Sequence, residues 1–329
     1  MTMPWGWLIV IYLFLGGLGA GAYLTSFAAE KGILGKSSSL KRAGYYLAAP
    51  IVAIGTLLLV FDLGQGLHKP WILPGLLSNL GSVMTLGVYI LSVFIILGLL
   101  KVYFVLKKKT APAVITWGGA VFALATGTYT GLLLAVIKAI PFWHSAILPF
   151  LFVVSALSTG LSATILLASV VEKNGTSQRR EGQVHLLLIA MELLIATLFF
   201  GTLGFGLGGQ VSKDTVETVM AGKYALVFWG YFIGLGLLFP LTVYIYQYLS
   251  TKQGADTILT EPALPDLSAK QGAVAAMAES TLPRGEQVAA AQHSYWTVAA
   301  DWAVLIGGFA LRTLIIFAAI PIWDGITIH

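Results

Sequence analysis

Residues 5–29 read WGWLIVIYLFLGGLGAGAYLTSFAA, a run of apolar and small residues that contains no charged side chain. A helix that crosses the hydrocarbon core of a bilayer needs about 20 such residues. Seven more stretches of similar length and character follow along the chain, at roughly 44–67, 80–106, 113–138, 145–171, 183–210, 219–249 and 298–320. The sequence therefore predicts an all-α integral membrane protein with eight transmembrane helices.

The composition agrees with this prediction. Of the 329 residues, 57% are hydrophobic and only 10% are charged, whereas a water-soluble domain carries about 25% charged residues. The chain has no cysteine, which excludes disulfides, cysteine-ligated iron–sulfur clusters and thiolate zinc sites within this polypeptide. A soluble enzyme and a cysteine-ligated metalloprotein are both ruled out.

The positive charges predict the orientation in the membrane. Lys and Arg gather in alternate loops, at Lys31, Lys36, Lys41, Arg42, Lys107–Lys109, Lys173, Arg179, Arg180, Lys252, Lys270 and Arg284, whereas the opposite loops hold only Lys69, Lys138 and Lys213. Loops rich in Lys and Arg stay in the cytoplasm, so both termini are expected outside. The basic pI of about 9.2 then reflects topology, and we expect no nucleic-acid partner.

Short motifs recur along the chain, two pairs about 140 residues apart and a third about 180 apart, which fits the same offset plus the polar segment between the last two spans. They pair FDLGQGL (61–67) with GTLGFGL (201–207), LGAG (18–21) with LSTG (157–160), and AIPFW (139–143) with AIPIW (319–323). Four spans separate the copies, so both halves would have the same orientation. This pattern predicts two parallel-repeat four-helix bundles; chance similarity among Gly- and Leu-rich helices is the alternative.

The expected domain boundaries follow from the repeat and from one long polar segment. Residues 1–143 form the first bundle, and residues 144–249 together with 298–329 form the second. Residues 250–297, rich in Ala, Pro, Gly and mixed charge, cannot bury much apolar surface and are expected to be a flexible cytoplasmic connector.

Ionisable side chains within the spans require a reason, because a charge in the bilayer is costly. Asp62, Glu192 and Arg312 are the clearest cases, with Lys101, Lys223 and Asp301 nearer the boundaries. At about 1.5 Å per residue, Asp62, Arg312, Tyr12 and Tyr129 share the outer half of the bilayer, and Glu192 lies deeper. The alternatives are a solvated carboxylate for Asp62, packing roles for the tyrosines, and a structural ion-pair role for Arg312.

The histidines do not predict a haem site. A membrane b-type haem is usually held by a His pair on facing helices. His68, His144, His293 and His329 fall in loops or tails, and His185 is expected at a helix start. No pair lies within the predicted spans, so neither haem nor an iron–sulfur cluster is expected in this chain.

A series of motifs, in order along the chain, resembles a known family. These are YLFLGGLGAGAYL (12–24), LVFDLG (59–64), YTGLLL (129–134), PFW (141–143), SALSTG (155–160) and GGFALR (307–312). Together they look like the polysulfide reductase membrane-subunit family, also called NrfD-like anchors. The matches extend from residue 12 to about residue 320, apart from the connector.

The resemblance implies an integral, quinone-reactive subunit in the cytoplasmic membrane of a bacterium or archaeon, not catalytic alone. Such subunits exchange electrons between menaquinol or ubiquinol and a four-cluster ferredoxin-like iron–sulfur subunit. That subunit typically serves a molybdopterin catalytic subunit, commonly on the outer face. This chain has no cysteine to hold a cluster of its own, so electrons would pass directly to the partner.

The resemblance also assigns residues. Tyr129 matches a helix-four tyrosine among the family's quinone contacts, whereas Tyr12 stands where a family histidine is expected. Tyr12, Tyr129 and Arg312 are therefore the expected quinone-binding residues. Asp62 or His68 would accept protons near the outer face, since quinol oxidation releases two protons, and Glu192 would belong to a proton path towards the cytoplasm.

Two other functions fit the same features. Parallel repeats and intramembrane charges also suit a multi-pass secondary transporter. A purely structural anchor, with another subunit handling the quinone, is the third interpretation. The subunits that purify with the chain would separate these functions.

Overall fold

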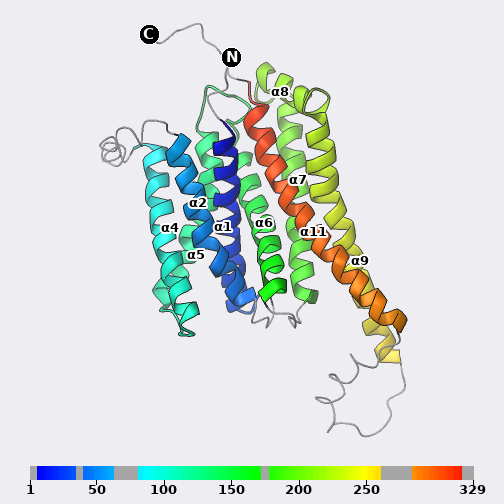
Figure 1. The fold of residues 1–329 in the computed structure, drawn as a ribbon. Coiled ribbons are helices and arrows are strands. Elements are labelled where there is room, and N and C mark those ends of the chain that lie inside the picture. The colour runs from blue at the N-terminus through cyan, green and yellow to red at the C-terminus, as the bar shows by residue number, and fades with distance from the viewer. Residues whose placement is uncertain (1–5, 35–39, 63–80, 172–177, 261–283, 321–329) are drawn as a thin grey trace.

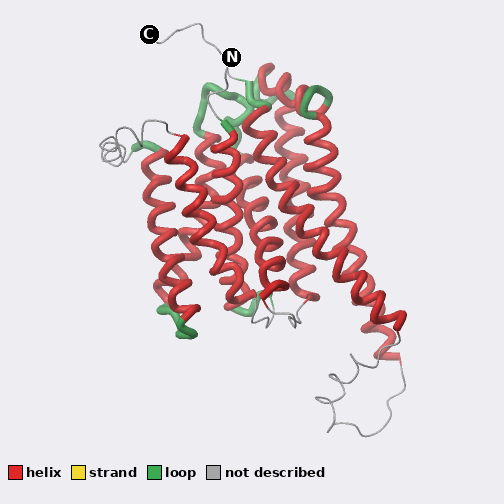
Figure 2. Tube along the Cα trace, viewed as in Figure 1, coloured by secondary structure: helices red, strands yellow, loops and turns green. Residues whose placement is uncertain are grey.

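The structure is a computed structural model that describes residues 6–34, 40–62, 81–171, 178–260 and 284–320 (Figure 1). In these residues the secondary structure is helical, with turns between the helices and no strand (Figure 2). Within the same residues, eight spans are long and apolar enough to cross a membrane. The prediction of an all-α membrane protein with eight transmembrane helices is therefore confirmed.

The spans are built by nine helices, because two consecutive helices share the seventh span. Their bounds are α1 Trp7–Glu30, α2 Leu40–Asp62, α4 Val83–Leu106, α5 Ala113–Ala135, α6 Ile147–Val171, α7 Gln178–Gly204, η1 Leu226–Leu238, α9 Phe239–Thr260 and α11 Arg284–Phe317. A short helix, α8 (Gln210–Met220), lies between the sixth and seventh spans.

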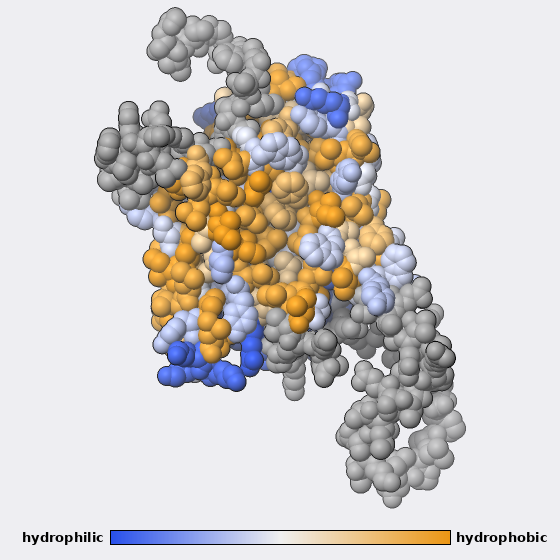
Figure 3. All heavy atoms as spheres, viewed as in Figure 1, coloured by the Kyte–Doolittle hydropathy of each residue, from blue (hydrophilic) through white to orange (hydrophobic). Residues whose placement is uncertain are grey.

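Figure 1 shows α1, α2, α4 and α5 on one side of the molecule and α6, α7, α9 and α11 on the other. We call the end at which α1 begins and α11 ends the Trp7 face. The opposite end, which carries the turn Lys107–Lys109, is called the Lys107 face. The hydrophobic side chains form a broad band between these ends, and hydrophilic ones gather at the ends themselves (Figure 3). This distribution matches a protein that is surrounded by lipid at mid-height.

Local sequence explains how two of the helices end or change. At the end of α7, Gly206 adopts φ +85°, its N–H donates to Leu203 O, and the N–H of Leu207 donates to Thr202 O. This is the Schellman pattern, in which glycine adopts the left-handed conformation at little cost. Thirteen residues of η1 form a π-helix directly before Pro240, which has no N–H to continue an α-helical ladder.

The two central helices touch at their glycines. A Cβ at Gly21 of α1 would collide with Ala156 O and the Gly160 backbone of α6, and a Cβ at Gly160 would collide with Gly21. The same close approach joins η1 to α11 at Gly236 and Gly307. Small residues let membrane helices pack backbone to backbone. These contacts place α1 and α6 at the centre, where they are among the most buried spans.

Several helix ends differ from the sequence prediction. The sixth span was expected from residue 183, but α7 begins at Gln178. On either side of the predicted connector, α9 continues to Thr260 and α11 starts at Arg284. These extensions are less hydrophobic than the spans but contain good helix formers, such as Gln, Arg, Glu and Ala, so hydropathy alone placed the boundaries inside the helices.

Candidate functional site

Two tyrosines lie at the same depth below the Trp7 face. Tyr12 is five residues from the start of α1 and Tyr129 is six residues from the end of α5, about 7.5 and 9 Å along the helix axes. They are 0% and 4% exposed, and their hydroxyls are close enough to interact electrostatically. The Tyr12 hydroxyl has no hydrogen-bond partner among the described residues.

The Tyr129 ring packs directly against a glycine of a neighbouring helix. It fills the space beside Gly87 of α4, where a Cβ would collide with the phenol ring. The Tyr129 hydroxyl is thereby directed towards the helix interface between α4 and α5. A buried hydroxyl without a partner is costly, and the Tyr12 hydroxyl, which has none among the described residues, is available to donate a hydrogen bond to a ligand.

The Arg312 side chain is completely buried and reaches deeper than the tyrosines, to Gly17, which is ten residues from the start of α1. Its Nη1 donates to Ser155 Oγ at 2.6 Å and to Gly308 O at 2.8 Å. The guanidinium also lies over the rings of Phe14 and Phe152, 5.8 and 5.3 Å from their centroids. Its Nε and Nη2 have no hydrogen-bond partner among the described residues, so the guanidinium retains unused donors.

Glu192 shares a serine with Arg312. It is 2% exposed, and its carboxyl group lies beside the hydroxyls of Ser155 and Ser158 on α6. The described side chains show no Glu192–Arg312 ion pair within 4.0 Å, although the two charges interact through space. The Ser155 hydroxyl accepts a hydrogen bond from Arg312 and lies beside the Glu192 carboxyl group, so Ser155 connects the two charged residues.

The structure thus brings the predicted site residues together as two pairs. Tyr12 and Tyr129 form the pair nearer the Trp7 face, and Arg312 and Glu192 form the deeper pair. Asp62 is the last residue of α2, but its side chain lies outside the described residues. His68 lies outside them as well, so its predicted role remains a prediction. In the described residues, no three His, Cys, Asp or Glu side chains are grouped to hold a metal ion.

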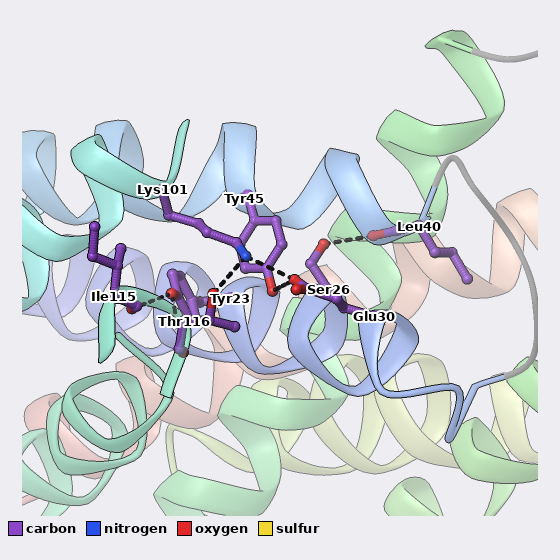
Figure 4. Close-up of polar contacts among 8 residues, drawn as sticks. All are labelled: Tyr23, Ser26, Glu30, Leu40, Tyr45, Lys101, Ile115 and Thr116. Atoms are coloured by element: carbon purple, nitrogen blue, oxygen red, sulfur yellow. Dashed lines mark hydrogen bonds and ion pairs between the residues drawn. The ribbon is translucent and has the colours of Figure 1, made fainter. Parts of the chain in front are cut away.

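A third polar group lies near the Lys107 face, between α1, α2, α4 and α5 (Figure 4). Lys101 Nζ is 2.8 Å from Glu30 Oε2 and donates to Thr116 Oγ1 at 2.8 Å. The Tyr45 hydroxyl donates to Glu30 Oε2 at 2.6 Å, and Tyr23 donates to backbone oxygens at the start of α5. We call Glu30, Tyr45, Lys101 and Thr116 the Lys101 cluster; it ties four helices together.

Sequence reasoning missed His185. It was expected at a helix start, but it is the eighth residue of α7 and is completely buried. Its spacing from Glu181 and Glu192, four and seven residues, places all three on one face of a helix. That spacing was the available signal.

Comparison with known proteins identifies the family. The family described as "Polysulphide reductase, NrfD" matches residues 1–265. One of the polysulfide reductase polypeptides of Wolinella succinogenes is 33% identical over 267 residues, which cover 74% of this chain and 83% of that relative. The chain belongs to the NrfD polysulphide reductase family.

Further relatives of this NrfD-family chain come from other bacteria. Protein NrfD of Escherichia coli is 30% identical over 274 residues, covering 73% of this chain and 84% of the relative. One of the selenate reductase subunits of Mesobacillus selenatarsenatis is 30% identical over 118 residues, covering 34% of this chain and 27% of the relative. The family resemblance expected from the motifs is confirmed, and the chain is a multi-pass membrane protein of the NrfD family.

Proposed function

We propose that this chain is the quinone-reactive membrane subunit of a multi-subunit respiratory oxidoreductase. Electrons would pass between menaquinol or ubiquinol and a ferredoxin-like iron–sulfur subunit that serves a molybdopterin catalytic subunit. Membership of the NrfD family supports the role of membrane anchor. The observation that carries the quinone assignment is the buried Tyr12 hydroxyl, which has no partner among the described residues and lies beside Tyr129.

The tyrosine pair fits the chemistry of a quinone head group. A quinone supplies two carbonyl oxygens, which accept hydrogen bonds, and carries two electrons and two protons when reduced. The hydroxyls of Tyr12 and Tyr129 can donate to such oxygens, and the Tyr129 ring packs against Gly87. Burial below the Trp7 face excludes bulk water and leaves the bilayer as the route of entry for an apolar ligand.

The remaining predicted residues take roles in proton and charge handling. In this proposal Asp62 and His68 accept protons at the Trp7 face. The unused Nε and Nη2 donors of Arg312 supply positive charge beneath the head group, and Glu192 belongs to a proton path between the site and the Lys107 face. The Trp7 face would be the outer one, as the distribution of Lys and Arg predicts, and the iron–sulfur partner would dock there.

Replacing Tyr129 by Phe tests the site in the assembled complex. We expect quinol-dependent reduction to fall by about two- to twelvefold, because one hydrogen bond contributes about 0.5–1.5 kcal/mol. The rate with an artificial soluble donor should be unchanged. The matched control is Tyr231→Phe, because Tyr231 of η1 is 48% exposed at the lipid-facing surface. Wild-type quinol kinetics in Tyr129→Phe would remove Tyr129 from the site.

Tyr12→Phe tests whether the Tyr12 hydroxyl binds the quinone or has no ligand. Removal of an unused buried hydroxyl should raise the melting temperature and leave quinol oxidation intact, since the unpaired group is costly. Removal of a quinone-binding hydroxyl should lower the quinol-dependent rate. Co-purification of iron–sulfur and molybdopterin subunits supports the proposal, whereas a chain that purifies alone and is stabilised by a solute would indicate a transporter.

A further inference from the structure

Another group of buried polar and ionisable side chains, separate from the site pairs and the Lys101 cluster, lies where α6, α7, α9 and α11 meet. His185 Nε2 is 3.0 Å from Ser162 Oγ, and His185 Nδ1 is 3.5 Å from Asp301 Oδ1. The Tyr244 hydroxyl donates to Asp301 Oδ1 at 2.7 Å, and its ring lies 4.4 Å from the imidazole. We call Ser162, His185, Tyr244 and Asp301 the His185 cluster; each is at most 4% exposed.

The His185 cluster differs from the Lys101 cluster in how its polar atoms are satisfied. Lys101 Nζ has a carboxylate and a hydroxyl as partners and the Tyr45 ring at 4.7 Å, as expected of a structural network. His185 Nδ1 makes no hydrogen bond among the described residues, although Asp301 is 3.5 Å away. A buried polar atom left unsatisfied requires an explanation, and a role in proton transfer or a bound water molecule would supply one. A small movement of the Asp301 carboxyl group brings it within hydrogen-bond distance of Nδ1, which is the distance at which a proton is transferred.

The His185 cluster has a polar neighbour on the side of the Lys107 face. Glu181 precedes His185 by one turn of α7 and interacts electrostatically with Asp301. Glu181 is only partly buried and lies in the first turn of α7, at the end of the bundle that borders water. The ionisable groups that face Asp301 are thus Glu181 and His185 from α7 and Tyr244 from α9.

On the opposite side, hydroxyls of α6 lead towards the deeper site pair. Ser155, Ser158 and Ser162 are spaced three and four residues apart and share one face of the helix. Ser162 contacts His185, and Ser155 and Ser158 lie beside Glu192. Side chains one turn apart have Cβ atoms about 5–6 Å apart, a distance that one bridging water spans.

From this arrangement we propose that the His185 cluster is a proton-exchange site, filled from the Lys107 face and connected through α6 to Glu192. Water at that face protonates Asp301 by way of Glu181. Asp301 passes the proton to His185 Nδ1, Nε2 releases its own proton to Ser162 Oγ, and the Ser162 hydroxyl proton moves on through bridging water and Ser158 to the Glu192 carboxylate. The imidazole is then neutral with its proton on Nδ1, and a flip of the ring restores the starting arrangement. Asp301 is left as a carboxylate and is reprotonated from the same face. Both ring nitrogens of a histidine can exchange protons in this way.

The test is infrared difference spectroscopy of the full chain in lipid vesicles, titrated with pH in H2O and in D2O. We expect a carboxylic-acid C=O band that appears on acidification and shifts in D2O. Asp301→Asn should abolish that component, although its amide oxygen still accepts from Tyr244. The matched control Asp214→Asn, at an exposed position of α8, should leave it intact.

A cluster in which Asp301 takes up no proton from the water would give a different result. Unchanged spectra in Asp301→Asn would overturn the proposal, as would an Asp301 band that does not shift in D2O. If Asp301→Asn does not fold, the same spectra of His185→Gln test the proposal instead. Loss of the imidazole should shift the Asp301 titration, and an unshifted titration would equally overturn the proposal. Because no quinone is needed, the result stands apart from the Tyr129 experiment.

Discussion

At the scale of single residues, the exposed fraction of a charged side chain determines how much the protein is destabilised when that side chain's ion-pair partner is removed. In the Lys101 cluster, the Lys101 side chain is 4% exposed and the Glu30 side chain is 36% exposed. A lysine that cannot reach water depends on its counter-charge, because an unpaired charge in the protein interior is strongly destabilising. A carboxylate at a partly open position can be hydrated instead.

This difference predicts an asymmetry between two variants. Glu30→Gln should destabilise the protein by about 3–5 kcal/mol, because it leaves Lys101 buried without its carboxylate. Lys101→Met should cost about 1 kcal/mol or less, because Glu30 can then bind water. Thermal unfolding in detergent measures both, and the double variant should recover most of the Glu30→Gln loss. Equal losses in the two single variants would contradict this explanation.

The site residues show how far single-residue reasoning extends. Glu192 and Arg312 could be predicted because a charged side chain in an apolar span requires a reason, and Tyr129 because of the motif around it. Their partners could not be predicted. Ser155 connects Arg312 and Glu192 only because α6, α7 and α11 meet at that depth. How these helices pack cannot be predicted from the sequence of any one of them.

At the scale of the elements, hydropathy predicted the eight spans but not their ends. The polar run QRREG (178–182) was left outside the predicted span, yet it is the first turn of α7, so His185, expected at a helix start, is the eighth residue of the helix and is buried. Hydropathy measures average polarity and cannot separate a polar turn that packs against other helices from one that faces water. His185 was misplaced for this reason.

The crossing of α1 and α6 gives a prediction for a single methyl group. Gly160→Ala should destabilise the protein by about 1–3 kcal/mol, the usual cost of overpacking, because its Cβ would collide with the Gly21 backbone. The matched control is Gly201→Ala in α7, where nothing lies within 4 Å of the added Cβ. There alanine should stabilise the helix slightly. Thermal unfolding of both variants measures the difference, and equal melting temperatures would rule out close packing as the reason for Gly160.

At the scale of the whole molecule, the crossing also bears on the repeat. Gly21 and Gly160 are corresponding positions of the repeated motifs LGAG and LSTG, and in the fold they contact each other. Two copies related by a two-fold axis along the membrane normal would meet in this way, since such an axis brings equivalent positions together. The contact supports the two-bundle arrangement, which remains a prediction.

The orientation of the whole molecule can be measured because the chain contains no cysteine. Single cysteines can be placed at exposed Lys213 on α8, near the Trp7 face, and at exposed Lys109, at the Lys107 face. If the positive-inside rule holds, a membrane-impermeant maleimide added to intact cells should label Lys213→Cys, and Lys109→Cys only after permeabilisation. The quinone site would then lie beneath the outer surface, and the His185 cluster would draw protons from the cytoplasm. The reverse labelling pattern would invert both assignments and place the electron-accepting partner in the cytoplasm.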